Sequence, residues 1–272
     1  MSTSNMPTPL TDLELLAIQA EALMDQRGRL TGLCGLMIGT ALDGQLMLIG
    51  SDIPDALVPA LTDALDFCPP APAVHLEPPA LAVCREILQA VCGPMTLHAG
   101  PYYTFEREVT VRLDLPIIRS DGAADARLRH LNPGNRDDDE WDALLDGTLG
   151  PWAMALVDDR VVSICHTPRP LSARAAEAGV WTHPEYRGRG YAAAVTATWA
   201  DIVRPSGRYL FYSTDAQNFS SQRVAERLEL RQIGWTWNLA RATAEPGDSR
   251  HPLMRRDSAP GLSTDSADAA QP

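Results

Sequence analysis

The sequence contains no lysine, because all 23 of its basic residues are arginine. A lysine Schiff base, a lysine general base and the lysine of a P-loop are therefore excluded. Acidic residues outnumber basic ones by 35 to 23, which gives a formal net charge of -12. A surface with this charge repels phosphate backbones, so we expect no nucleic-acid partner.

Long apolar runs and clusters of metal ligands are also missing. The longest apolar stretch, near residues 33–49, is broken by glycine and aspartate and falls short of the roughly 20 apolar residues of a membrane span. The first nine residues lack the basic and apolar segments of a secretory signal. The five cysteines form no C-x-x-C pair and the six histidines no His-x-x-x-His pair, so we expect reduced thiols and no metal. These features favour a cytoplasmic protein without membrane contact.

The length and composition fit one large or two small globular domains. The chain has 272 residues, of which 45% are hydrophobic and 21% charged. Residues 1–9 and 242–272 have few large apolar residues and many small, polar or proline residues, which predicts that both ends are disordered. We divide the remainder into an N-terminal α/β accessory region, residues 10–104, and a second region, residues 105–241.

In the accessory region the pattern predicts three helices and one hairpin. Thr11 and Glu14 fit a capping box that opens a helix over residues 11–24. Asp43-Gly44 separates two β-prone stretches, which predicts a hairpin over residues 33–49. Two further helices, each with a proline near its first turn, are predicted over residues 54–67 and 79–91.

The second region alternates strands and helices more regularly. This order predicts an α/β fold in which a mixed central sheet is flanked by helices. Strands are predicted over residues 109–118, 152–157, 160–166, 178–182, 208–213 and 233–239, and helices over residues 121–130, 137–146, 190–203 and 220–228.

The stretch that carries chemistry is a turn rich in glycine and arginine. After the strand at residues 178–182, the chain runs through His183-Pro184-Glu185-Tyr186 into Arg187-Gly188-Arg189-Gly190, which opens an alanine-rich helix. Glycines let backbone N–H groups converge without Cβ obstruction, and the first N–H groups of a helix lie at the positive end of its dipole. With two arginines as further donors, the turn predicts an anion site suited to a pyrophosphate.

A dinucleotide-binding turn is an alternative for the same residues. Gly188, Gly190 and Ala193 satisfy the pattern G-x-G-x-x-A, and Asp215 follows the next strand, where a ribose-binding acid could lie. Against this, five residues separate the strand from the first glycine, and only one plausible strand remains after Asp215. We therefore rank an NAD-type site third among the possible functions.

The same stretch resembles the GNAT N-acetyltransferase superfamily more closely. Arg187, Gly190 and Ala192 fill the acetyl-CoA motif of that family, Arg/Gln-x-x-Gly-x-Gly/Ala. The resemblance extends to Asn218 and Ser221, because the family commonly carries an asparagine at the start of the next helix.

The resemblance is specific over residues 178–234, extends by element order back to about residue 107, and does not cover residues 10–100. It implies a GNAT-like acyl-CoA N-acyltransferase fold for residues 105–241. It also implies acetyl transfer from acetyl-CoA to a primary amine, by direct attack in a ternary complex and without a metal.

Contacts with acetyl-CoA are implied by the same resemblance. The open backbone of Val180, Trp181 and Thr182 would pair with the pantetheine arm, and an N–H near Val180 or Trp181 would polarise the thioester carbonyl. Asn218 would hydrogen-bond the same arm. The pyrophosphate would be held by the turn and the first helical residues, namely Arg187, Gly188, Arg189, Gly190, Tyr191, Ala192 and Ala193.

The general acid departs from the family pattern. Many GNAT enzymes carry a tyrosine seven residues after the asparagine, as acid for the leaving thiolate, and here that position is Ala225. Tyr212 and Ser221 are nearby substitutes, although a packed strand aromatic and a polar residue of the first helical turn would explain them as well. Glu229 also replaces a glycine that is frequent in the family.

Two residues are candidates for the general base. Glu177 opens the central strand, where the family often carries a carboxylate, but a solvated charge at the strand end is the alternative. His166 ends the second strand of a predicted hairpin, and a histidine there could accept a proton near pH 7. His183 fits a structural or surface role. The acidic run at residues 137–140 either complements a helix dipole or attracts a cationic amine.

Two classes of function remain open on this basis. The first is an acetyl-CoA-dependent N-acetyltransferase whose partner is an amine of a small molecule or a protein, with the negative charge favouring a cationic acceptor. The second is a noncatalytic acyl-CoA-binding module, because Ala225 leaves the usual acid position vacant. Neither the acceptor nor the oligomeric state is predicted.

Overall fold

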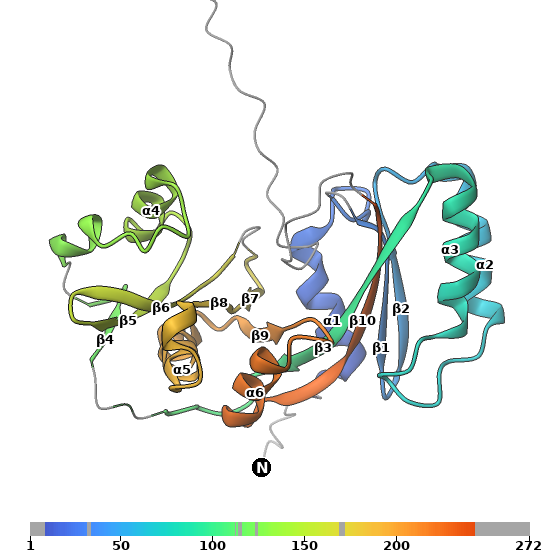
Figure 1. Ribbon diagram of the computed structural model, residues 1–272. Coiled ribbons are helices and arrows are strands. Elements are labelled where there is room, and N and C mark those ends of the chain that lie inside the picture. The colour runs from blue at the N-terminus through green and yellow to red at the C-terminus, as the bar shows by residue number, and fades with distance from the viewer. Residues whose placement is uncertain are drawn as a thin grey trace, which may run out of the picture.

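The computed structural model describes residues 9–31, 34–111, 113, 116–122, 125–168 and 172–242. These residues form two sheets with helices packed on their faces, so the predicted mixed α/β architecture is confirmed (Figure 1). Within these ranges, no helix is both long enough and apolar enough to cross a bilayer.

The elements follow one another in three groups along the chain. The first group is α1 (Asp12–Ala20), η1 (Glu21–Leu23), β1 (Cys34–Ala41), β2 (Gly44–Ile49), η2 (Asp55–Leu57), α2 (Val58–Phe67), α3 (Pro79–Cys92) and β3 (Met95–Thr104). The second is β4 (Ile117–Arg119), η3 (Ala126–His130), α4 (Asp138–Leu145), β5 (Trp152–Val157), β6 (Arg160–His166), β7 (Ala175–Glu177) and β8 (Gly179–Thr182). The third is η4 (Pro184–Tyr186), α5 (Tyr191–Val203), η5 (Arg204–Ser206), β9 (Tyr209–Ser213), α6 (Phe219–Arg227) and β10 (Arg231–Arg241).

The larger sheet combines strands from both ends of the chain. Its order is β2-β1-β10-β3-β9-β7, so β3 lies between β10 and β9. All pairs in this sheet are antiparallel except β7 with β9. The accessory region and the second region therefore share one sheet. The smaller sheet, in the order β4-β5-β6-β8, is antiparallel throughout.

The two sheets diverge within a single extended segment. Its first part, β7, pairs in parallel with β9, and this register ends with Glu177 opposite Phe211. The N–H of Ala178 donates to the Phe211 carbonyl at 2.9 Å, and from Gly179 onward β8 pairs with β6 instead. The segment therefore changes sheets at Ala178, which makes β8 an edge strand of the smaller sheet.

Helices cover both faces of the two sheets (Figure 1). α1 packs on one face of the larger sheet, where Leu16 meets Phe211, while α2 and α3 cover the opposite face in a cluster that includes Leu61. α5 packs on the smaller sheet through its alanines and Trp199, and α4 covers the other face of that sheet around Trp141. Alanine on the buried face of α5 lets the helix lie close to the strands, which fixes its N-terminus beside β8.

Several predicted elements are confirmed with their local causes. At the start of α1 the Thr11 hydroxyl accepts from the N–H of Glu14, and the Glu14 carboxylate accepts from the N–H of Thr11. Both predicted hairpins form, as β1–β2 and β5–β6. Asp158 and Asp159 turn the second hairpin with φ of 50° and 56°, as a two-residue turn of type I′ requires.

Two predicted elements are wrong over most of their length. Of the strand predicted over residues 109–118, only the end belongs to a strand, β4, and residues 112, 114 and 115 lie outside the described residues. Val109 and Val111 instead pack directly on the core under α5. The helix predicted over residues 121–130 is reduced to the short 3-10 turn η3, which Asp125 caps, while residues 123 and 124 lie outside the described ranges.

The strand β3 was not predicted, although it lies in the middle of the larger sheet. Gly100 and Pro101 interrupt its pattern, and a Gly-Pro pair normally argues against a central strand. In the fold, Gly100 is required because a Cβ there would come within 1.8 Å of the Thr214 carbonyl oxygen, where the chain leaving β9 continues alongside β3. A tertiary contact thus explains why Gly100, which interrupts the strand pattern in the sequence, is present in β3.

Candidate active site

The glycine-rich turn forms a loop with unpaired backbone donors. The N–H of His183 donates to the Val162 carbonyl at 2.9 Å, which fixes the entry to the loop on β6. Gly188 and Gly190 then adopt φ of +75° and +87°, and Gly190 is the N-cap of α5. The backbone N–H groups of residues 188–193 form no hydrogen bond with the described residues, so they are available to an anion at the positive end of the α5 dipole.

Three arginines surround this loop without a carboxylate partner among the described residues. Arg189 lies over the Tyr186 ring, with its Cζ 5.1 Å from the ring centroid, and Arg187 Nε donates to the Thr182 carbonyl at 3.3 Å. Arg227, in the last turn of α6, lies against the loop itself, because a Cβ at Gly190 would be 2.8 Å from its Nη1. No sequence pattern indicates Arg227, since a cation in the last turn of a helix is ordinary.

Beside the loop, one edge of β8 is open. Because His183 donates to Val162, and antiparallel hydrogen bonding alternates along a strand, Trp181 and Gly179 also direct their N–H groups toward β6. Val180 and Thr182 therefore direct theirs to the opposite edge, which has no strand partner among the described residues. The alternation selects Val180 over Trp181 as the residue whose N–H is exposed along this edge.

On the α6 side, the predicted polar residues form one group. Asn218 caps α6, since its Oδ1 accepts from the N–H of Ser221 at 3.2 Å. The Ser221 hydroxyl lies 2.6 Å from the Tyr212 hydroxyl, which is buried, and burial raises the pKa of Tyr212 above its ordinary range. Ala225, at the position of the family's tyrosine, is fully buried under this group. Tyr212 and Ser221 are thus adjacent to each other and to the helix start that Asn218 caps.

Glu177 lies on the other face of the same strands, where the sheets diverge. Its Oε2 accepts from Gln19 Nε2 at 2.8 Å, and its Oε1 accepts from the Ser213 hydroxyl. Burial raises the pKa of Glu177, while the hydrogen bonds from Ser213 and Gln19 lower it in part. The carboxylate is therefore not a solvated charge at a strand end. Sequence patterns pointed to neither Gln19 nor Ser213, because both reach Glu177 only through the tertiary fold.

His166 lies in a different environment, with both ring nitrogens in contact with other groups. Its Nε2 is 3.0 Å from Arg136 Nη2, and its Nδ1 is 3.1 Å from the Gly179 carbonyl oxygen. Burial and the Arg136 charge lower the pKa of His166 to about 4. The ring is therefore neutral at pH 7, donating from Nδ1 and accepting at Nε2, and this arrangement favours a structural role.

The remaining candidates also have local partners. His183 Nε2 is 2.8 Å from Arg160 Nη2, and its ring stacks edge-on with Trp181. In the acidic run, Asp137 caps α4 by accepting from the N–H of Glu140, and Glu140 pairs with Arg136. No group of three or more potential metal ligands occurs among the described residues.

The two buried cysteines, Cys84 and Cys165, do not offer a nucleophile. Cys68, Cys84, Cys92 and Cys165 are free thiols. Burial raises the pKa of Cys84 to about 11 and that of Cys165 further, so the two buried thiols stay protonated at pH 7.

Sheet topology also bears on the dinucleotide alternative. A dinucleotide-binding fold needs several adjacent parallel strands, whereas β7 with β9 is the one parallel pair among the named strands of the described chain. The glycine-rich turn also follows the 3-10 turn η4 rather than the strand itself. The described residues therefore do not form a dinucleotide-binding fold.

Comparisons with known proteins agree with this geometry. A family model described as the acetyltransferase (GNAT) domain matches residues 94–231. No curated protein matches the chain.

The chain is similar to several solved structures, among them the following three. The first is a GCN5-related N-acetyltransferase from Kribbella flavida, which is 16% identical over 87% of this chain and 96% of that chain, with a TM-score of 0.45. The second is a GCN5-related N-acetyltransferase-like protein from Streptococcus suis 89/1591, which is 18% identical over 76% of this chain and 83% of that chain, with a TM-score of 0.42. The third is a GNAT-family protein from Novosphingobium aromaticivorans DSM 12444, which is 24% identical over 54% of this chain and 66% of that chain, with a TM-score of 0.41. The chain spans just under two thirds of the Novosphingobium protein. Since the family model covers half of the 272 residues, including the loop, the open edge of β8 and Glu177, the chain belongs to the GNAT acetyltransferase family.

Proposed function

We propose that the protein is an N-acetyltransferase that moves the acetyl group of acetyl-CoA to a primary amine by direct attack in a ternary complex. Membership of the GNAT family supports acyl transfer from an acyl-CoA in general. The observation that carries the finer proposal is the open edge of β8, which begins where the sheets diverge and leads into the free N–H groups of residues 188–193.

Binding of acetyl-CoA uses backbone and arginine donors along one path. The N–H groups of residues 188–193, with Arg187, Arg189 and Arg227, supply the positive potential that a pyrophosphate needs in a protein of net charge -12. The pantetheine arm is an amide chain, so it can pair with the open edge of β8 as an added strand would. The N–H of Val180 then polarises the thioester carbonyl, and Asn218 supplies a further polar contact to the arm.

Proton transfer on the acceptor side falls to Glu177. An alkyl ammonium has a pKa of about 10.4, so most of the amine must lose a proton before it can attack. Burial raises the pKa of Glu177, which makes its carboxylate a stronger base for the amine proton. His166 is a weaker candidate, because its pKa is lowered to about 4 and both of its nitrogens have partners.

Protonation of the leaving thiolate demands less of the protein than deprotonation of the amine. A thiol has a pKa of about 8.5, so water or a weak acid is enough to protonate the thiolate near pH 7. The Tyr212 and Ser221 hydroxyls, which lie 2.6 Å apart on the α6 face, are our candidates for this role. Alanine at position 225 therefore does not prevent protonation of the thiolate, because another acid can replace the usual tyrosine at this step.

Turnover with a panel of amines tests the proposal. We expect acetyl-CoA with a suitable amine to release free thiol and acetylated amine in equal amounts, with cationic amines preferred. Tight binding of acetyl-CoA without turnover on any amine would support the noncatalytic acyl-CoA-binding module instead. Binding of NAD but not of acetyl-CoA, measured by titration calorimetry, would exclude both.

Replacement of Arg227 tests whether α6 contributes to the pyrophosphate site. We expect Arg227→Gln to raise the Kd of acetyl-CoA by roughly 5- to 12-fold, because a charge-assisted contact is worth about 1.5 kcal/mol or somewhat less when exposed. The loss should shrink at high salt, since screening weakens the wild-type contact as well. Calorimetry at two salt concentrations measures both effects. Arg27→Gln, at an exposed arginine in the turn after η1, is the control and should bind acetyl-CoA like the wild type.

A further inference from the structure

Helix α1 belongs to the accessory region and lies outside residues 94–231, yet it reaches the candidate active site. Its buried face is apolar at Leu15, Leu16 and Ile18 and polar only at Gln19, whose side chain is 6% exposed. A buried amide without a partner would cost free energy, so a polar residue on this face needs a partner. That partner is Glu177, which accepts from Gln19 Nε2 at 2.8 Å.

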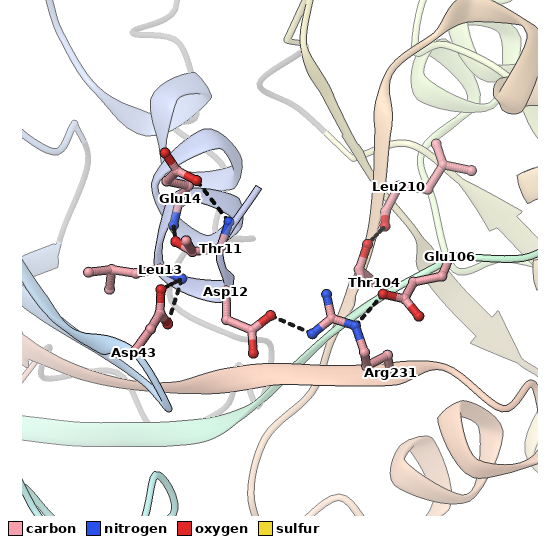
Figure 2. A network of polar contacts seen from close by, with 9 residues as sticks. All are labelled: Thr11, Asp12, Leu13, Glu14, Asp43, Thr104, Glu106, Leu210 and Arg231. Atoms are coloured by element: carbon pink, nitrogen blue, oxygen red, sulfur yellow. Dashed lines mark hydrogen bonds and ion pairs between the residues drawn. The ribbon is translucent and has the colours of Figure 1, made fainter. Parts of the chain in front are cut away.

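The start of α1 is fixed to the sheet by a polar network, which Figure 2 shows. Asp12 in the first turn pairs with Arg231 of β10, and Arg231 also pairs with Glu106 just after β3. The N–H of Leu13 donates to the carboxylate of Asp43 in the β1–β2 turn at 3.2 Å. These contacts tie the start of α1 to β10 and to the β1–β2 turn of the larger sheet, so the helix holds Gln19 at a defined position next to β7.

The groups that set the charge state of Glu177 are few. Besides burial, the hydrogen bonds from Ser213 and Gln19 determine its pKa. The charged residues on the adjoining segments act elsewhere. Glu21, after α1, pairs with Arg174, which precedes β7, and Asp215, after β9, accepts from the N–H of Gln217. Two neutral donors, one on each carboxylate oxygen, therefore favour the charged form of Glu177 against the effect of burial and orient its carboxylate.

We propose that α1 completes the active site, with Gln19 as the positioning residue for the Glu177 carboxylate. The inference rests on the proposed role of Glu177 as base. With one oxygen held by Gln19 and the other by Ser213, the carboxylate cannot rotate freely, and each oxygen keeps a lone pair that can accept an amine proton. The accessory region thus has a direct part in acceptor activation, on the face opposite α5 and α6.

The test is the pH dependence of kcat/KM for the amine in the near-isosteric variant Gln19→Met. Loss of a donor to the carboxylate raises the pKa of Glu177. We therefore expect the acid limb of the pH profile, where kcat/KM falls as the base becomes protonated, to move to higher pH by about one unit. At neutral pH, kcat should fall roughly tenfold or less, while the Kd of acetyl-CoA stays unchanged. Gln89→Met, at an exposed glutamine of α3, is the control for the same chemical change and should leave the limb in place.

A second variant keeps the test decisive if Gln19→Met does not fold. Gln19→Glu retains the size and polarity of the side chain but places two carboxyl groups together, so the acid limb should move up further than in Gln19→Met. If either variant folds and the acid limb of its kcat/KM profile lies at the same pH as in the wild type, the proposed role of Gln19 is overturned. Full activity of Glu177→Gln would instead overturn the proposed base, so the two failures are distinguishable.

Discussion

Replacing Gly190 by valine is expected to raise the Kd of acetyl-CoA about 100-fold, which corresponds to about 2.7 kcal/mol of binding free energy. Gly190 has φ +87°, a conformation that a β-branched residue rarely adopts, so the loop must change shape or store strain. A side chain at this position would also displace the Arg227 guanidinium, whose Nη1 would lie 2.8 Å from its Cβ. Both effects disturb the loop N–H groups that are proposed to hold the pyrophosphate.

The matched control is Gly207→Val. Gly207 has φ +73° and lies between η5 and β9, and no atom would come within 4 Å of a Cβ there. Both variants should lose a similar amount of stability, about 1–3 kcal/mol for a residue held in this conformation. Only Gly190→Val should lose affinity. Calorimetry and thermal unfolding separate the two effects, and an unchanged Kd in folded Gly190→Val would refute the assignment of the loop.

The loop is the part of the site that sequence patterns predict well. A strand, a turn with two glycines and the first turn of a helix all lie within about 15 consecutive residues, and each obeys short-range rules of backbone conformation. The start of α5 follows the prediction, and the positive φ of Gly188 and Gly190 explains why glycines occupy these positions. The open edge of β8 also follows in part, because the strand was predicted, but its free side depends on the sheets diverging at Ala178.

The acceptor side could not be predicted in the same way. Gln19 and Glu177 are 158 residues apart, and nothing in the pattern of α1 distinguishes Gln19 from a solvent-facing residue. The contact depends on β3, whose Gly100-Pro101 pair concealed a strand, because β3 brings the accessory region into the same sheet as β9. Arg227 is a similar case, since only the packing of α6 beside the loop brings it to Gly190. Residues joined by tertiary packing carry no local signal.

Replacing Glu177 by glutamine is expected to lower kcat for the amine by about 100-fold or more at neutral pH, the usual contribution of a general base. The Kd of acetyl-CoA should not change, because Glu177 lies on the face opposite α6 and away from the loop. The loss should shrink as the pH approaches the amine's own pKa, where the free amine no longer needs a base. Steady-state rates between pH 6 and about pH 10 test this. Glu21→Gln, which removes a partly exposed carboxylate paired with Arg174, is the control and should keep wild-type rates.

The same variant should be more stable than the wild type at neutral pH. Because burial raises the pKa of Glu177, the folded state holds a proton there more tightly than the unfolded chain does. Stability from this group is therefore present at low pH and is lost as the pH rises from the ordinary value of 4.5 through the raised one. Glutamine keeps the shape without the buried charge, because its oxygen can accept from Gln19 Nε2 and its NH2 can donate to the Ser213 hydroxyl. The Tm of Glu177→Gln should therefore exceed that of the wild type above this interval and match it below. A carboxylate retained at the cost of stability is expected where the charge is needed for chemistry, and equal melting at every pH would contradict that explanation.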